Sequence, residues 1–330
     1  MRNITITTLV LITAIMIGSV GAENYAGYAG AFLRNGLGAR AMGIGGAYTA
    51  IAEGPEATYY NPAGLGYTKN VEIRSSYKTL SLDRHFGHVA IAFPIRNEAS
   101  MAASWINAGV SDVPAIDRSR NFYGDVSNSS NAFALSFAKV LHPKFSFGAN
   151  LKYIQEKLDE TESFTIGLDI GLLSKIHEYI TLGAIVQNIG SKYKWDSSNV
   201  WRDGGDYDET FPFVMKFGAS GNLLNGNLIP AFDIETSDQS EMKFRAGSEY
   251  WLTKMVIRQV EDEYEEDVMI DVEEQVKIAG LRIGIDRGSP TFGGSIFYEV
   301  RNISMGVEYA YLIGREGTDS GHIFTFGLGF

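Results

Sequence analysis

Along much of this chain, apolar residues occupy every second position and small or polar residues lie between them. The final stretch, HIFTFGLGF, shows this most clearly, because Phe324, Phe326, Leu328 and Phe330 alternate with threonine and glycine. Side chains of a β-strand point alternately to its two faces, so each such stretch predicts a strand with one apolar face. In NISMGVEYAY, the same alternation places Glu308 on the second face. The pattern therefore predicts strands that are apolar on one side and carry small residues and few charges on the other.

Fourteen strands are expected from this pattern. Their ranges are 71–79, 86–95, 99–110, 131–141, 144–157, 163–175, 179–189, 211–220, 226–237, 240–251, 276–287, 290–300, 302–313 and 321–330. Short connections such as 96–98, 142–143 and 176–178 alternate with long ones at 111–130 and 190–210. An even number of strands, tight periplasmic turns and longer external loops are typical of bacterial outer-membrane barrels. The sequence therefore predicts an all-β fold, a transmembrane antiparallel β-barrel over residues 71–330.

A soluble β-sandwich is the alternative, because its strands alternate in the same way. A sheet face in water would carry many lysines and glutamates. Here the second face is rich in Gly, Ser, Ala and Thr, with sparse charges such as Asp169 and Glu308. This composition favours the barrel.

The first residues have the form of a secretory signal. Residues 1–22 contain Arg2, an apolar stretch from Leu9 to Val20 and small residues before a cut expected after Ala22. A spanning helix needs roughly twenty apolar residues, so this stretch is too short for a membrane anchor. A lipoprotein signal would need a cysteine at the cut, and the chain has none. We therefore expect export to the cell outer membrane through a cleaved signal peptide.

Composition and motifs exclude several kinds of chemistry. The absence of cysteine excludes disulfides, thiol catalysis and Cys-ligated metals. A formal net charge of −11 argues against nucleic acid as a partner. No GxSxG or HExxH motif occurs, and His85 and His88 are spaced so that a strand would point them to opposite faces. We expect no enzyme activity, no metal and no cofactor. The alternative to this expectation is a barrel-type acyl hydrolase, with a His–Ser–acid cluster at the outer edge of the barrel.

Residues 23–70 precede the first expected strand and do not alternate. Because the segment is long, apolar and rich in small residues, it would be poorly soluble in the periplasm, and we expect it to fold into the lumen as a plug. Its stretch GIGGAY resembles a dinucleotide-binding loop, but the preceding strand and the βαβ unit are missing. We interpret Gly43, Gly45 and Gly46 as positions of close backbone approach in this plug.

The stretch YYNPAGL follows within the same segment. Its Asn61 and Pro62 favour a turn, and Ala63 and Gly64 continue it; the bland alternative is a corner leading into the first strand. Over residues 38–65, the run GARAMGIGGAYTAIAEGPEATYYNPAGL resembles the N-terminal signature of the PorV/PorQ family, within the wider group of barrels similar to the FadL fatty-acid transporters. The resemblance implies a fourteen-stranded barrel with a plug and an Asn-Pro-Ala element.

Two functional hypotheses follow from this resemblance. The first is a PorV/PorQ-like component associated with type IX-like secretion, which would bind protein partners or cargo. The second is a FadL-like passive transporter of hydrophobic small molecules, which predicts an apolar pocket beneath the loops 111–130 and 190–210. Expected contacts in these loops are Phe122, Tyr123, Trp195 and Trp201, although such aromatics suit an interfacial girdle equally well.

Two other features carry expectations about partners. Residues 253–275 hold nine acidic side chains between Glu261 and Glu274, and VIRQV and VMIDV suggest a hairpin extension of the barrel. This extension is either a solvated protrusion or a docking surface for a basic partner or Ca²⁺. The terminal Phe330, with Phe324, Phe326 and Leu328, resembles the signal that the barrel assembly machinery recognises. The expected partners are therefore this machinery, the outer-membrane bilayer, and either secretion-system proteins or hydrophobic small molecules.

Overall fold

The fold is taken from a computed structural model of the chain, which describes residues 28–95, 98–116, 119–198, 204–261, 269–301, 303–314 and 320–330. The expected signal peptide, residues 1–22, lies outside the described residues. No helix within the described ranges is long and apolar enough to cross a membrane.

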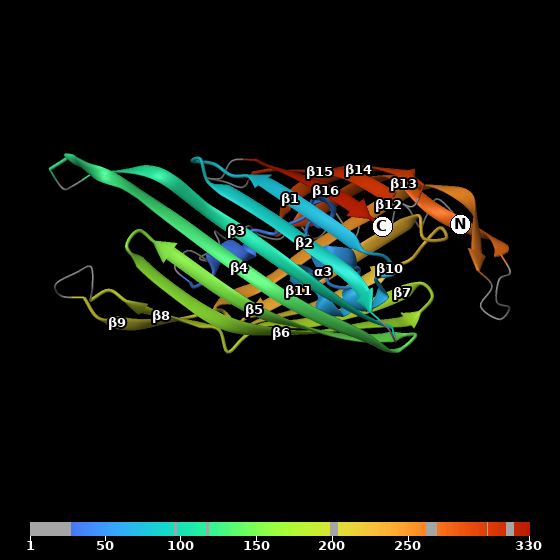
Figure 1. Ribbon diagram of the computed structural model, residues 1–330, viewed down its shortest axis with the longest axis horizontal. Helices are drawn as coiled ribbons and strands as arrows, with labels where there is room; N and C mark the ends of the chain where they lie inside the picture. Colours follow the sequence, from blue (N-terminus) through green and yellow to red (C-terminus); the bar gives the residue numbers. More distant parts are fainter. Residues whose placement is uncertain are drawn as a thin grey trace.

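Fourteen antiparallel strands close into a barrel in the order β1-β16-β15-β14-β13-β12-β11-β10-β7-β6-β5-β4-β3-β2 (Figure 1). Their bounds are β1 Glu72–Thr79, β2 His85–Ile95, β3 Ala99–Ile116, β4 Phe122–His142, β5 Phe145–Leu158, β6 Thr161–His177, β7 Ile180–Ile189, β10 Val214–Gly221, β11 Leu228–Ser237, β12 Ser240–Glu261, β13 Met269–Asp286, β14 Ser289–Val300, β15 Ile303–Leu312 and β16 Gly321–Gly329. The predicted fourteen-stranded barrel is confirmed. We call the end where β1 begins and β16 ends the terminal end, and the opposite end the loop end.

Two connections at the loop end are more regular than the sequence predicted. The prediction of a long loop at 111–130 is wrong, because β3 continues to Ile116 and β4 already begins at Phe122. Register shifts between Val110 and Val113 and after Ala115 interrupt the alternation, which is why the sequence pattern did not extend the strands. The hairpin of β3 and β4 is the long projection at the left of Figure 1.

The connection at 190–210 also contains strands. Residues Lys192–Asp196 form β8 and Asp206–Thr210 form β9, a separate two-stranded sheet. The hairpin packs on β6, where the Ser163 hydroxyl donates to the Lys194 carbonyl over 2.9 Å and the Lys192 amide donates to Thr165 over 3.0 Å. Because Thr165 and Ser163 are on the inner face of β6, the hairpin packs along the inner side of this strand and projects beyond the rim at the lower left of Figure 1.

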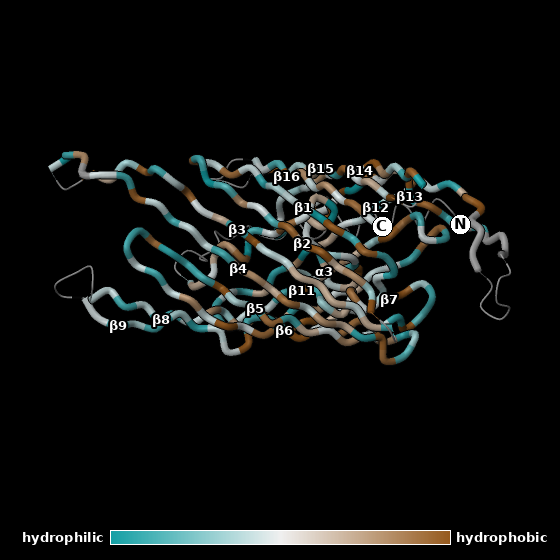
Figure 2. The backbone as a smooth tube through the Cα atoms, viewed as in Figure 1, coloured by the Kyte–Doolittle hydropathy of each residue, from teal (hydrophilic) through white to brown (hydrophobic). Residues whose placement is uncertain are grey.

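The two faces of the wall differ as the alternation predicted. On β16, Phe326 points outward and is 56% exposed, while Thr325 points inward and is fully buried. Glu308 of β15 lies on the inner face with 1% of its surface exposed. Hydrophobic and hydrophilic positions alternate along the wall strands in Figure 2. An exterior with this much exposed apolar surface is stable in a bilayer and is rarely found on soluble monomers.

Residues 28–70 form short helices that contact the inner faces of strands around the barrel (Figure 1). These helices are η1 Ala31–Arg34, α2 Ala39–Gly43, η2 Gly54–Glu56, α3 Ala57–Tyr60 and η3 Pro62–Tyr67. Helix α2 packs on β13 to β16, and η3 packs on β3 to β6. The same segment therefore touches opposite sides of the barrel. We call residues 28–70 the luminal segment.

Glycines on the inner wall allow the backbone of the luminal segment to approach closely. A Cβ added at Gly284 of β13 would lie 2.2 Å from the Gly45 nitrogen, and one at Gly148 of β5 would lie 2.3 Å from the Pro62 carbonyl carbon. Gly45 itself has a φ of +72°, and a Cβ there would lie 2.5 Å from the Ile285 carbonyl oxygen. The glycine-rich second face of the strands thus serves main-chain contacts that no larger residue permits.

At the terminal end, β12 and β13 extend beyond the wall as a two-stranded ribbon. Their pairing runs from Arg245↔Asp286 to Glu261↔Met269, whereas β13 pairs with β14 only as far as Ala279↔Ile296. The acidic tip, residues 262–268, lies outside the described residues. The ribbon therefore leaves both of its outer edges without a neighbouring strand beyond the rim.

Candidate functional site

A packed apolar cluster lies inside the barrel toward the loop end, and we call the space that its wall residues surround the chamber. Its side chains come from the luminal segment, from inward positions of β2 to β5, from β8 and from the residue after β9. They are Phe32, Phe86, Ile106, Ala108, Ala132, Ile154, Tyr193, Trp195 and Phe211, all buried in one packed cluster. A chamber of this composition suits an apolar molecule, because apolar surfaces attract one another in water regardless of direction.

The chamber is filled by the protein itself. Phe32 of η1 is 7% exposed and belongs to the same cluster as the wall residues. Phe211 reaches the beginning of η1, since a Cβ added at Gly30 would lie 2.2 Å from its ring. Within η1, Arg34 donates to the carbonyl oxygens of Tyr28 and Ala29, both over 3.1 Å. A ligand in the chamber would therefore have to replace the Phe32 ring.

Aromatic contacts hold the hairpin of β8 and β9 against the apolar cluster. Tyr193 packs edge-to-face on Phe211 and Trp195, with ring centroids 4.8 and 5.5 Å apart. The Trp195 indole donates to Glu209 over 3.0 Å, and its ring stacks on Tyr207. These contacts fix the position of the hairpin beside the chamber.

A small cavity of about 80 Å³ lies beside η1. The chamber residues Ile106 and Ala132 line it, so the cavity borders the chamber. Charged side chains such as Lys216, Glu235 and Arg245 line it as well. Burying a charged group is costly unless it is hydrated or paired, so this lining suits water better than an apolar ligand. The cavity at the loop end is thus small and partly charged.

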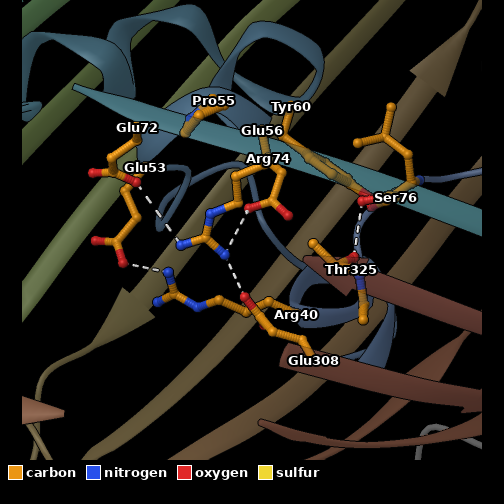
Figure 3. Close-up of polar contacts among 12 residues, drawn as sticks. Arg40, Glu53, Pro55, Glu56, Tyr60, Glu72, Arg74, Ser76, Glu308 and Thr325 are labelled. Carbon is orange, nitrogen blue, oxygen red and sulfur yellow. Dashed lines mark hydrogen bonds and ion pairs between the residues drawn. The ribbon is translucent and has the colours of Figure 1, made fainter. Parts of the chain in front are cut away.

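Deeper in the lumen, ion pairs fasten the luminal segment to the wall (Figure 3). Arg40 of α2 donates from Nε and Nη2 to the two carboxylate oxygens of Glu249 on β12, over 3.0 and 2.7 Å, and it also pairs with Glu53. Arg282 of β13 lies 3.2 Å from the same Glu249 carboxylate. The Arg40 guanidinium lies 5.3 Å from the ring centre of Trp251. We call the Arg40–Glu249 pair the latch.

A second group of charges lies between the luminal segment and the closure strands. Arg74 of β1 pairs with Glu308 of β15 and lies 3.8 Å from Glu56 of η2, as the close-up in Figure 3 shows. Burial raises the pKa of the Glu56 carboxyl to about 7, against the lowering effect of Arg74. The cationic side chains of Arg40 and Lys277 lower the pKa of Glu53, because they favour its charged form. The segment and the wall are therefore coupled through opposite charges.

The Asn-Pro-Ala element is a structural joint. The Asn61 side chain is fully buried and donates to the carbonyl oxygens of Thr49 and Leu172 over 2.9 and 3.0 Å, while its oxygen accepts from the Ala63 amide. One side chain thereby links two turns of the luminal segment to β6. Pro62 begins η3, where its missing N–H costs nothing. The element therefore fixes the position of η3 on the wall.

The residues expected as loop contacts are dispersed. Phe122 lies at the start of β4 and is 63% exposed, away from the chamber cluster, whereas Trp195 is 8% exposed within it. The side chain of Tyr123 and the whole of Trp201 lie outside the described residues. Sequence reasoning did not single out Phe32 or Phe86, because neither residue belongs to a distinctive motif. The signal that could have found them is a large ring among small residues.

The His and acidic side chains of the described residues were predicted to hold no metal ion. Among them, no group of three His, Asp or Glu residues could hold a metal ion. His322 bonds the Tyr309 hydroxyl over 2.8 Å, and His88 is buried inside β2 with neither ring nitrogen hydrogen-bonded. The polar groups of the described lumen serve mainly to pair the segment with the wall.

No protein-family model matches the sequence, and no curated protein matches it. The structure is similar to those of FadL-like outer-membrane transporters. These include the Ralstonia pickettii toluene transporter TbuX (TM-score 0.57, 13% identity, covering 89% of this chain and 98% of that one) and a Pseudomonas aeruginosa FadL homologue (0.56, 9%, 89% and 98%). The Pseudomonas putida toluene transporter TodX has a TM-score of 0.54 at 12% identity, covering 89% and 97%. These identities show a shared fold, and none of the three is a PorV/PorQ protein.

Proposed function

We propose that this chain is a passive transporter of small hydrophobic molecules in the outer membrane. The luminal segment is its plug, and η1 is the part of the plug that moves. The observation that carries this proposal is the apolar chamber at the loop end, which Phe32 fills. The likeness in fold to hydrocarbon transporters supports it. In this orientation, the loop end faces outward and the terminal end faces the periplasm, as in other bacterial barrels.

When a ligand displaces Phe32, the apolar surface of the chamber stays buried, and this burial is the main stabilising contribution there. An aromatic ring buries about 150–250 Å² of surface, and a monoaromatic hydrocarbon that takes its place buries a similar amount. The exchange therefore costs little free energy, and the ligand itself favours the open state. Passage needs no energy source, because the concentration gradient determines its direction.

The PorV/PorQ-like secretion role is the other hypothesis, and it rests on the resemblance over residues 38–65 alone. Extraction from native membranes in a mild detergent, followed by mass spectrometry, separates the two. Transport is favoured by a bound apolar molecule and no protein partner. A stoichiometric protein partner that stays with the barrel would instead favour secretion.

The direct test changes the ring that fills the chamber. Phe32→Ala removes most of a buried side chain, which typically costs about 3 kcal/mol or more, so the population with η1 displaced should rise about a hundredfold. The measurement is the initial uptake of radiolabelled toluene by cells that carry equal amounts of folded barrel in their outer membrane. We expect Phe32→Ala to increase uptake several-fold, until another step limits it.

Phe137→Ala is the matched control, because Phe137 points outward from β4 and is 41% exposed. It should leave uptake at the level of the unaltered protein. Uptake no greater than in cells without the barrel, for both the unaltered protein and Phe32→Ala, would refute the transport proposal.

A further inference from the structure

The barrel wall divides between β13 and β14 at the terminal end. Their pairing ends at Ala279↔Ile296, where β14 turns away with β15 and β13 continues with β12 into the ribbon. A cavity of about 690 Å³ lies at this division, and residues 275–278 of β13 and 296–299 of β14 line it from its two sides. We call it the β13–β14 notch.

From the notch outward along the ribbon, β13 has a free edge. Residues 269–277 pair with β12, from Glu261↔Met269 to Thr253↔Lys277, and with no other strand among the described residues. Alternate residues of a strand direct their main-chain N–H and C=O groups to opposite neighbours, so part of these groups point to the free edge. Such an edge is a template for a further strand. The chemistry that matches it is the backbone of an extended peptide.

Inside the notch, a buried hydrogen-bond donor lacks an acceptor. Trp251 of β12 is 1% exposed, lines the cavity and packs on Phe297 with ring centroids 5.7 Å apart. Its indole N–H makes no hydrogen bond with any described residue. Buried donors are normally paired, and the carbonyl oxygens of an extended peptide in the notch would supply the acceptor. A hydrocarbon has no atom that could do so.

The two faces of the free edge differ in chemistry. Lys277 lies on the inner face, with its ammonium 4.6 Å from the ring centre of Trp251, and alternation places the exposed Glu273 on the same face. Val276 lies on the outer face, where Tyr298 of β14 is 68% exposed on the other side of the notch. A strand that pairs with this edge would therefore be polar on its inner face and apolar on its outer face.

The charge of the edge determines which polar residues fit. Residues 269–277 contain three acidic residues and one lysine, Lys277, which already pairs with Glu53. Three of the four cationic side chains that line the cavity are engaged with carboxylates, namely Arg40, Arg74 and Lys277. The edge is therefore acidic, and it favours a strand with basic residues. A second copy of this edge is disfavoured, because it would place like charges opposite each other.

We propose that the free edge of β13 and the notch bind an extended segment of a partner protein by strand addition. The segment alternates basic residues, which face inward beside Glu273, with apolar residues, which face outward beside Val276 and Tyr298. This site is separate from the chamber and goes beyond the transport of hydrocarbon. It requires neither displacement of η1 nor passage of any molecule, so the two proposals stand or fall independently.

Disulfide cross-linking tests the site, because the chain has no cysteine of its own. Val276→Cys places one thiol beside the notch in the full-length barrel, which is purified in a nonionic detergent. The probe is a nine-residue peptide in which lysine and valine alternate, with one valine replaced by cysteine. Diamide oxidises the two thiols to a disulfide, and we expect one peptide per barrel.

Changes to the peptide test each part of the recognition. Glutamate in place of lysine should lower the yield about tenfold or more, because several cross-strand pairs change from opposite to like charges. Proline in place of the other valines should lower the yield to that of free cysteine, because proline cannot donate to the ladder. Cysteine moved to a lysine position should react less, because neighbouring side chains of a strand point to opposite faces.

Val113→Cys is the matched control, because it makes the same change on another free edge. Val113 lies on β3, beyond the last pair with β2 at His85↔Gly109, and it is 42% exposed. A register shift and Pro114 interrupt this edge, so it does not suit strand addition. The yield at Val113→Cys should be about a tenth of that at Val276→Cys or less. Folding of both variants is checked by their shift in mobility on heating in gels.

Three results would overturn the proposal. The first is an equal yield at the two positions, which would show only thiol reactivity. The second is an undiminished yield with the proline peptide or the glutamate peptide. The third is a disulfide between two Val276→Cys barrels that forms in preference to the peptide adduct, which would show that a second copy occupies the edge.

Discussion

Breaking the latch should destabilise the whole barrel, because Arg40 is the main charge that joins the luminal segment to β12. Arg40→Met keeps most of the side-chain volume and leaves Glu249 buried with only Arg282 beside it, at 3.2 Å. Removal of one partner from a buried ion pair costs about 3–5 kcal/mol, because the other charge remains without compensation. The remaining Arg282 places the expected loss at the lower limit, about 3 kcal/mol.

The assay is guanidinium unfolding of the purified barrel in detergent micelles, followed by the loss of the heat-modifiable band. A double-mutant cycle with Glu249→Gln isolates the pair, and it should give a coupling energy of about 2 kcal/mol, with the double variant more stable than the two single losses predict. Arg84→Met is the control, because Arg84 is exposed in the connection between β1 and β2 and bonds only the nearby Ser81 carbonyl among the described residues. Stability of Arg40→Met within about 0.5 kcal/mol of the unaltered protein would refute the argument.

Three further changes test other parts of the structure. Gly45→Ala should prevent or strongly reduce barrel assembly, because the added Cβ would collide with the Ile285 carbonyl. The control is Gly190→Ala, at a similar φ with nothing within 4 Å, which should cost only about 1 kcal/mol of stability. Equal losses of assembled barrel for the two variants in a gel mobility assay would contradict this. Deletion of Phe330 should lower the amount of assembled barrel without producing a soluble form, and an undiminished heat-modifiable band would argue against it. Glu56→Gln should flatten the pH dependence of stability. The raised pKa of Glu56 means that the fold favours its protonated carboxyl, so the stability of the unaltered protein falls as pH rises from about 4.5 through about 7. An equal fall in the variant would contradict the assignment.

Much of the wall could be predicted from the sequence, because alternation is a local property. Each expected strand overlaps one of the fourteen in the barrel. The pattern weakened where bulges shift the register, and the strand pair beyond Val110 was therefore expected to be a loop. The hairpin of β8 and β9 was missed for another reason. Its two strands are five residues each and pack against the inner face of β6, so neither has the regular apolar face of a wall strand.

The site was harder to predict, because its contacts join residues far apart in the chain. The sequence indicated that the inner face would be small and that Gly45 allows close approach, but not that Gly45 would meet Gly284. Likewise, Glu308 was expected to face inward, whereas its partners Arg74 and Arg282 became evident only from the closed barrel. Periodicity gives the direction of a side chain, and register between distant strands determines what it meets.

The way in which the luminal segment is held indicates which part of it can move. From α2 to η3, the segment is fixed by the latch, by the Asn61 joint and by main-chain contacts with wall glycines, and these would all have to break together. The chamber end is held differently, because Phe32 contributes apolar burial that an apolar ligand can replace. A ligand can stabilise only the state to which it binds more tightly. Under the proposed function, a hydrocarbon in the chamber favours displacement of η1 and leaves the latch closed. Transport should then respond to Phe32→Ala far more than to any change that only weakens the ion pairs.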